Sequence, residues 1–130
     1  MSSELFWLTL SVGLLLILWV PYTLARISEH GAKATLTYTA DKLPLPAWAE
    51  RAHRAHMNLV ENLLPFAALI LTVQAAALNN ATTALWAAIF FFARLAHAIV
   101  HCLGIPFART AAFAVGWLAC LVLLLRILGA

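Results

Sequence analysis

Four long apolar segments constrain the fold of this chain more than any other feature. They cover residues 5–24, 59–78, 83–103 and 107–128. Each is close to the ~20 residues that a helix needs to cross a hydrocarbon core, whereas barrel strands are half as long and alternate in polarity. The chain is 65% hydrophobic and only 10% charged, which is typical of integral membrane proteins. We therefore predict an all-α membrane protein whose four transmembrane helices form one bundle and a single domain, residues 1–130.

The helix that contains the second apolar segment is predicted to begin before that segment does. Pro44 and Pro46 interrupt the chain, and a helix can start near residue 47. At 1.5 Å per residue, a helix from there to residue 78 is longer than the ~30 Å hydrocarbon core. Its first turns should therefore project into the head-group layer and bring polar side chains to the membrane surface.

The distribution of basic residues predicts the orientation of the bundle. Most lie in or beside the first loop, and Arg109 flanks the third loop, while residues 79–82 carry no charge. Cytosolic loops carry an excess of Lys and Arg, so we expect the first and third loops in the cytosol and both termini on the opposite side. The net charge of +3 then reflects topology and contact with membrane lipid rather than a nucleic-acid partner.

Polar residues on the helix that starts near residue 47 form the first part of a candidate site. Glu50, Arg54, Asn58 and Glu61 follow one another at i, i+4, i+8 and i+11 and so share one face, with Arg51 beside them. The alternative for Glu50 and His53 is a solvated anchor at the membrane surface. A charge costs about 2.5–3.5 kcal/mol at the bilayer centre, so the deeper residues are candidates for function.

The third and fourth apolar segments supply the rest of the predicted site. Arg94, His97 and His101 are spaced i, i+3, i+7 within an otherwise apolar helix, and Arg109 and Thr110 open the last one. Arg94 needs a counter-charge at its depth, and we expect Glu61 on the antiparallel neighbour to provide it. Together these groups predict a basic cavity at the cytosolic end of the bundle with an anionic ligand.

The order of these residues resembles the MAPEG family, the membrane-associated proteins of eicosanoid and glutathione metabolism. The resemblance covers roughly residues 50–120. Its most specific part is Glu50-Arg51-x-x-Arg54-Ala55-His56-x-Asn58-x-x-Glu61 followed by Pro65-Phe66, and a second part is Arg94-x-x-His97 ahead of Pro106 and Arg109-Thr110.

The resemblance implies a homotrimer of four-helix subunits that binds glutathione as co-substrate between neighbouring subunits. Arg51 and Arg54 would face the carboxylates of the peptide, and Asn58 and Glu61 would hold its amide and amino groups. The remaining positions that the resemblance implicates are Arg94, His97, His101 and Thr110 as lining residues, Arg109 as the catalytic arginine that stabilises the thiolate, and Arg26 by its place at the end of the first span.

Three positions depart from the pattern of the better-known members of that family. Met57 stands where some members carry another arginine, His101 where a tyrosine is usual, and Phe113 where another aromatic hydroxyl occurs. The departures argue against one specific prostaglandin or leukotriene step. They favour glutathione transferase- or peroxidase-like activity on lipophilic electrophiles or lipid hydroperoxides that enter from the bilayer.

Other functions remain alternatives at this point. A non-catalytic membrane scaffold that binds lipid or glutathione fits the same residues. A small multidrug transporter has a similar length but needs a carboxylate within its first span, and residues 12–24 have none. A haem or metal protein is disfavoured because Arg94 and Arg109 would repel a cation near His97 and His101, so we predict no metal site.

Overall fold

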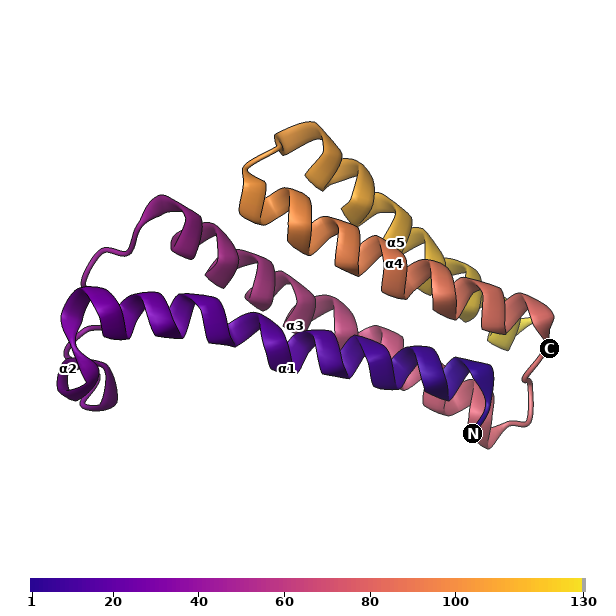
Figure 1. Cartoon of the computed structure of the whole chain (residues 1–130). Helices are drawn as coiled ribbons and strands as arrows, with labels where there is room; N and C mark the ends of the chain where they lie inside the picture. The colour runs from indigo at the N-terminus through magenta and orange to yellow at the C-terminus, as the bar shows by residue number, and fades with distance from the viewer. Residues whose placement is uncertain (130) are drawn as a thin grey trace.

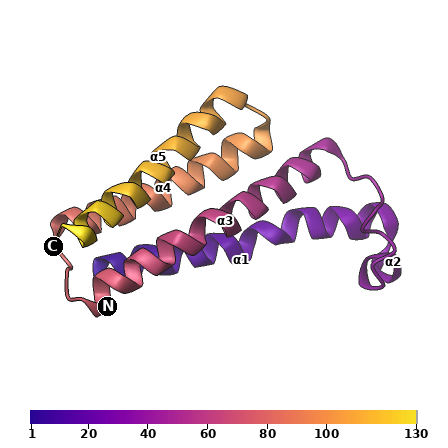
Figure 2. The ribbon, with the colours of Figure 1, turned by 180° about the vertical axis from the view of Figure 1, so that it is seen from behind.

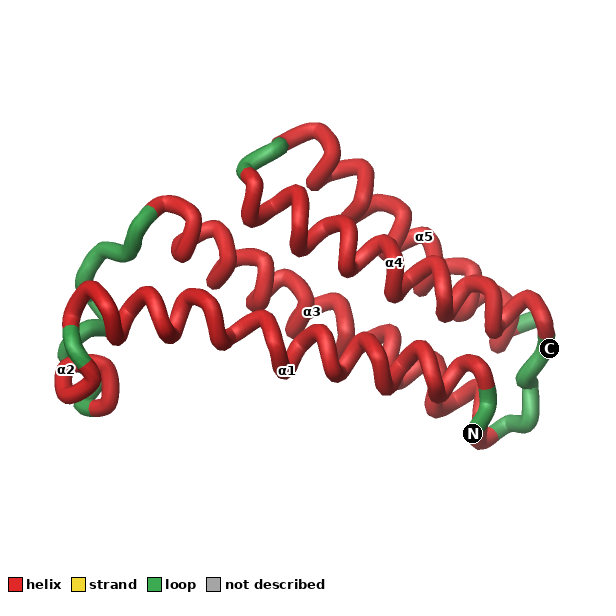
Figure 3. Tube along the Cα trace, viewed as in Figure 1, coloured by secondary structure: helices red, strands yellow, loops and turns green. Residues whose placement is uncertain are grey.

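The computed structural model describes residues 1–129 of the chain, so residue 130 of the predicted domain lies outside the described part (Figure 1). Within this range the chain is helical apart from short connections (Figure 3). The elements in chain order are α1 (Ser3–His30), α2 (Ala32–Leu36), α3 (Ala47–Ala75), α4 (Ala81–Leu103) and α5 (Pro106–Leu128). All except α2 are long and apolar enough to cross a membrane, which confirms the predicted all-α membrane fold with four spanning helices.

The four long helices run up and down the bundle in sequence order. The helix α1 lies beside α3, and α4 lies beside α5, in both views of the ribbon (Figures 1 and 2). The two pairs are close at the end that holds the chain termini and the α3–α4 connection, and they diverge toward the opposite end. The start of α3 and the α4–α5 connection therefore lie at the end where the pairs diverge, together with α2 (Figure 1).

The core of the bundle lies between α3 and α4 and is closed by α1 and α5. Phe66 and Phe90 are fully buried and stack with their ring centroids 3.7 Å apart and their planes 8° from parallel. Leu59, Ile70 and Leu123 belong to the same buried cluster. Large apolar side chains elsewhere on α1 and α5 are exposed, as expected for helix surfaces that face lipid.

The helices begin and end at individual residues rather than at the limits of the apolar segments. The helix α1 continues past the first apolar segment to His30, and Gly31 ends it with a φ of 86°, a value that favours glycine. The first loop contains the five-residue helix α2. Pro46 precedes the first residue of α3, and Pro106 is the first residue of α5, where its missing N–H has no helical partner to lose.

Candidate functional site

Two adjoining clefts lie at the end of the bundle where the helix pairs diverge. One has a volume of about 170 Å³ and is lined by Arg51, Arg54, His101, Gly104, Ile105, Pro106 and Arg109. The other has a volume of about 200 Å³ and is lined by Asn58, His97, His101, Arg109, Thr110 and Phe113. Because His101 and Arg109 line both, we treat them as one site, the polar cleft.

The end of α4 shapes the mouth of the polar cleft. Gly104 adopts a left-handed conformation with a φ of 76° and ends the helix, and Pro106 begins α5 after one intervening residue. The Nε of Arg51 on α3 donates a hydrogen bond of 2.9 Å to the carbonyl of Cys102. A cation beside the last carbonyls of a helix also complements the negative end of the helix dipole. Arg51 thus joins α3 to α4 where their ribbons diverge.

Arg94 lies behind the polar cleft, in the centre of the bundle. Only 1% of its surface is exposed. Its Nη1 donates a 2.9 Å hydrogen bond to Oδ1 of Asn58, and its Nη2 donates a 3.1 Å bond to the carbonyl of Phe113. The guanidinium also lies 5.7 Å from the ring centroid of Phe90 and 5.3 Å from that of Phe113, within the range of cation–π attraction. Arg94 therefore connects α3, α4 and α5.

Two histidines on α4 continue from Arg94 toward the mouth of the polar cleft. His97 and His101 are both buried, with their ring centroids 5.3 Å apart and their planes nearly perpendicular. Nδ1 of His101 is buried without a hydrogen-bond partner among the described residues. Arg54, Arg109 and Thr110 are more exposed and lie around this imidazole pair on α3 and α5.

The predicted ion pair between Glu61 and Arg94 is wrong for the subunit described. Glu61 is exposed on α3, and the one ion pair within 4 Å among residues 1–129 joins Arg26 to Asp41. Asn58 precedes Glu61 by three residues, so the two side chains leave the helix about 60° apart. The rotation of α3 brings Asn58, rather than Glu61, to face Arg94.

The structure therefore separates the residues predicted from the sequence into two groups. Those that line the polar cleft or lie directly behind it are Arg51, Arg54, Asn58, Arg94, His97, His101, Arg109 and Thr110. Glu61 lies outside the cleft, and Arg26 lies on α1, where Nη1 contacts Oδ1 of Asp41 at 3.3 Å. Glu50, in the first turn of α3, accepts a 3.4 Å hydrogen bond from the N–H of Leu45, which precedes the helix.

Sequence reasoning overlooked two residues that support the site. Asn62, one turn after Asn58, donates a 2.7 Å hydrogen bond to the carbonyl of Asn58. Gly116 is buried inside α5 against the guanidinium of Arg94. A glycine in a helix interior destabilises the helix relative to alanine and often marks a place where another group packs close to the backbone. The position of Gly116 within the last apolar segment was therefore the sequence signal for its role.

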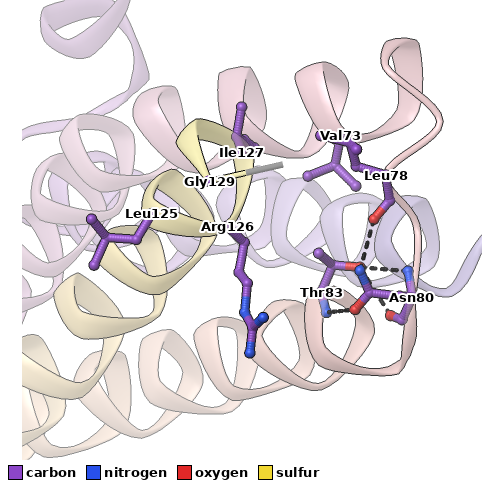
Figure 4. A pocket seen from close by; sticks show the side chains of 8 residues that line it. All are labelled: Val73, Leu78, Asn80, Thr83, Leu125, Arg126, Ile127 and Gly129. Carbon is purple, nitrogen blue, oxygen red and sulfur yellow. Dashed lines mark hydrogen bonds between the residues drawn. The ribbon is translucent and has the colours of Figure 1, made fainter.

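A different pocket lies at the opposite end of the bundle, near the chain termini (Figure 4). It has a volume of about 280 Å³, and its polar side chains include Asn80, Thr83 and Arg126. Asn80 and Thr83 form the capping box of α4, and the Thr83 hydroxyl also lies 2.5 Å from Oε1 of the buried Glu4. Asn80 and Thr83 thus complete the start of α4, and the pocket contains none of the predicted site residues.

The lining of the polar cleft is basic and would suit an anionic ligand. Three arginines and the hydroxyl of Thr110 line it, and no carboxylate does so among the described residues. No group of three His, Cys, Asp or Glu side chains in residues 1–129 is placed to hold a metal ion. Arginine is suited to carboxylates because its planar fork of donors matches their two oxygens.

Comparison with protein families gives a match that covers nearly the whole chain. The MAPEG family model matches residues 5–129. The chain belongs to the MAPEG family. No curated protein and no solved structure gave a match. Membership places this chain among membrane proteins connected with glutathione and eicosanoid metabolism, as the resemblance had implied.

Proposed function

We propose that this MAPEG protein binds glutathione in the polar cleft and uses it against lipophilic electrophiles or lipid hydroperoxides from the bilayer. The observation that carries the proposal is the convergence of Arg51, Arg54 and Arg109 on one cleft without a carboxylate among its lining residues. Glutathione carries two carboxylates and one ammonium group at neutral pH and is a net anion. The arginines supply charge-assisted donors for its carboxylates.

Arg109 is the candidate for stabilising the thiolate. It lines both parts of the polar cleft at the start of α5, so it can lie close to a ligand that spans them. A positive neighbour favours the thiolate over the thiol, and a hundredfold change in that ratio corresponds to roughly 2.7 kcal/mol. One guanidinium can supply an effect of this size where the effective dielectric constant is well below that of bulk water.

The reaction then follows from the thiolate. The thiol proton passes to water, and the sulfur forms a bond to an electrophilic carbon while that carbon releases its leaving group or bonding pair. With a hydroperoxide, the sulfur bonds to the terminal oxygen as the O–O bond breaks, and the departing alkoxide takes a proton from water to give the alcohol. A second glutathione then reduces the sulfenic acid and gives the disulfide and water.

We also propose a homotrimer in which a neighbouring subunit closes the polar cleft. Glu61 and Arg54 are exposed on α3 in the single subunit, and a charge facing lipid is costly. A neighbouring subunit can provide partners for both and leave the ligand between subunits, as the family resemblance implies. The first and third loops are proposed to face the cytosol, where glutathione is abundant.

The function is tested with purified protein in detergent. Millimolar glutathione should raise the temperature of thermal unfolding because a ligand that binds only the folded state stabilises it. The same preparation should conjugate a model electrophile or reduce a lipid hydroperoxide. An assembled protein whose unfolding temperature does not respond to glutathione would refute the proposal, whereas binding without turnover would favour the scaffold alternative.

A further inference from the structure

The buried guanidinium of Arg94 has neutral partners only. The Oδ1 of Asn58 and the carbonyl of Phe113 accept from its two terminal nitrogens, and no carboxylate of the described residues lies within 4 Å. Its Nε is buried without a partner among residues 1–129. A buried charge of this kind depends strongly on the few acceptors that it has, because burial removes water as an alternative.

Gly116 provides the space that the guanidinium occupies. A Cβ atom at this position would lie 2.7 Å from Nη2 of Arg94 and 2.8 Å from its Nε. Both distances are too short for real contacts, so any other residue would force the guanidinium to move. The absence of a side chain at Gly116 therefore determines where Arg94 lies between α3 and α5.

The position of Arg94 determines the orientation of the Asn58 amide. A guanidinium has donors and no acceptor, so the oxygen of the amide must face it. Asn58 also lines the polar cleft together with His97 and Arg109. With Oδ1 directed at Arg94, the Nδ2 group is the polar part of the amide that remains for a ligand.

We infer that Arg94, held in place by Gly116, is a positioning residue that makes Asn58 present its NH₂ group to the polar cleft. This subsite then takes an oxygen acceptor of the ligand, a carboxylate or a peptide carbonyl, and rejects a donor. The inference rests on the proposed binding of glutathione and adds to it the part of the ligand that Asn58 selects. Arg94 acts through Asn58 and has no contact with the reacting sulfur in this account.

The decisive variant is Asn58→Asp, because it should change glutathione affinity without lowering the unfolding temperature. The new carboxylate gives Arg94 an anionic partner, so the unfolding temperature without ligand stays the same or rises. The same change replaces the donor that faces the cleft with an acceptor, and glutathione affinity should fall about tenfold or more. Asn79→Asp makes the same chemical change on an exposed residue of the α3–α4 connection and should leave the affinity unchanged.

Titration calorimetry of the three proteins with glutathione distinguishes the outcomes. Wild-type affinity in Asn58→Asp would overturn the inference while leaving the proposed function intact. Failure of the wild-type protein to bind glutathione would overturn the proposed function and the subsite with it. Loss of binding in Asn58→Asp with a retained or raised unfolding temperature supports the inference, since a purely structural role for Asn58 predicts a parallel loss of both.

A second set of variants tests the role of Gly116. Gly116→Ala should displace the guanidinium and weaken glutathione binding severalfold, whereas Gly13→Ala in α1 should not, because a Cβ there meets nothing within 4 Å. Adding Arg94→Lys to Gly116→Ala shortens the crowded group and keeps a donor for Asn58. The pair should recover part of the lost affinity, and simple addition of the two losses would contradict the steric role of Gly116.

Discussion

Both ends of the bundle contain polar side chains, but the two sets differ in what they contact. At the end near the chain termini, the groups satisfy one another: the Thr83 hydroxyl bonds to Glu4, and Gln74 accepts from Ser2 and Asn79. At the other end, the side chains of Arg54 and Arg109 line a cleft that contains no carboxylate of the described residues. The first arrangement stabilises the fold, whereas the second leaves donors that our proposal assigns to a ligand.

This contrast matters because hydrogen-bond donors that lack protein partners weaken a fold unless water or a ligand satisfies them. At the end near the termini, the capping box of Asn80 and Thr83 satisfies backbone donors at the start of α4. The polar cleft instead places cations where the helix pairs diverge (Figure 1). Variants at one end should therefore change ligand binding and chemistry, and variants at the other should change stability alone.

The largest effect is expected for Arg109→Ala at the polar cleft. Loss of this guanidinium should reduce the ratio of thiolate to thiol in bound glutathione about a hundredfold, equivalent to roughly 2.7 kcal/mol, with little effect on assembly. Ultraviolet absorbance of the thiolate measures the change. Arg126→Ala removes the same charge from the opposite end of α5 and is the matched control. Equal thiolate absorbance in wild type and Arg109→Ala would refute the assigned role.

A smaller effect, confined to stability, is expected for Thr83→Val. The substitution leaves the carboxylate of Glu4, which is 2% exposed, without the hydroxyl that bonds it. Loss of such a partner costs about 1–3 kcal/mol in the free energy of unfolding. Chemical unfolding in detergent measures it, and glutathione affinity should not change.

The matched control is Thr82→Val in the same turn of α4. Thr82 donates its backbone N–H, rather than its hydroxyl, to the Asn80 cap, so the bond survives the substitution. A decrease in glutathione affinity for Thr83→Val but not for Thr82→Val would contradict the proposal that this end of the bundle affects stability alone.

The smallest effect is expected for Arg26→Gln on α1. Arg26 is bound to Asp41 at 3.3 Å, with 21% and 49% of the two side chains exposed. A pair of this kind contributes about 0.2–1 kcal/mol to stability. Glutathione affinity should remain that of the wild type because Arg26 does not line the polar cleft in the subunit. A clear loss of glutathione affinity would instead indicate that Arg26 contributes to the site of a neighbouring subunit.

The sequence predicted the membrane fold and the position of most polar residues along it. Helical spans follow from the length of apolar segments, and residues such as Arg54 and Arg109 are placed at one end by helix order alone. Contacts across helices were harder to predict. Whether Asn58 or Glu61 faces Arg94 depends on the rotation of α3, which spacing along one helix does not determine.

The same limitation applies to Gly116 and to Arg26. The close approach of Arg94 to Gly116 depends on the packing of α4 against α5, and the sequence records only that a glycine interrupts an apolar helix. The partner of Arg26 is set by the path of the first loop, which includes α2. The arrangement of neighbouring subunits remains a prediction from the family resemblance.

Calorimetric titration of glutathione into wild-type protein and into Arg54→Glu tests most directly whether the polar cleft binds the anionic tripeptide. The account predicts saturable binding to the wild type at one molecule per subunit and an affinity at least about tenfold lower in Arg54→Glu, where a cleft cation becomes an anion. Absence of saturable heat in the assembled wild-type protein, or equal affinity in the two proteins, would contradict it.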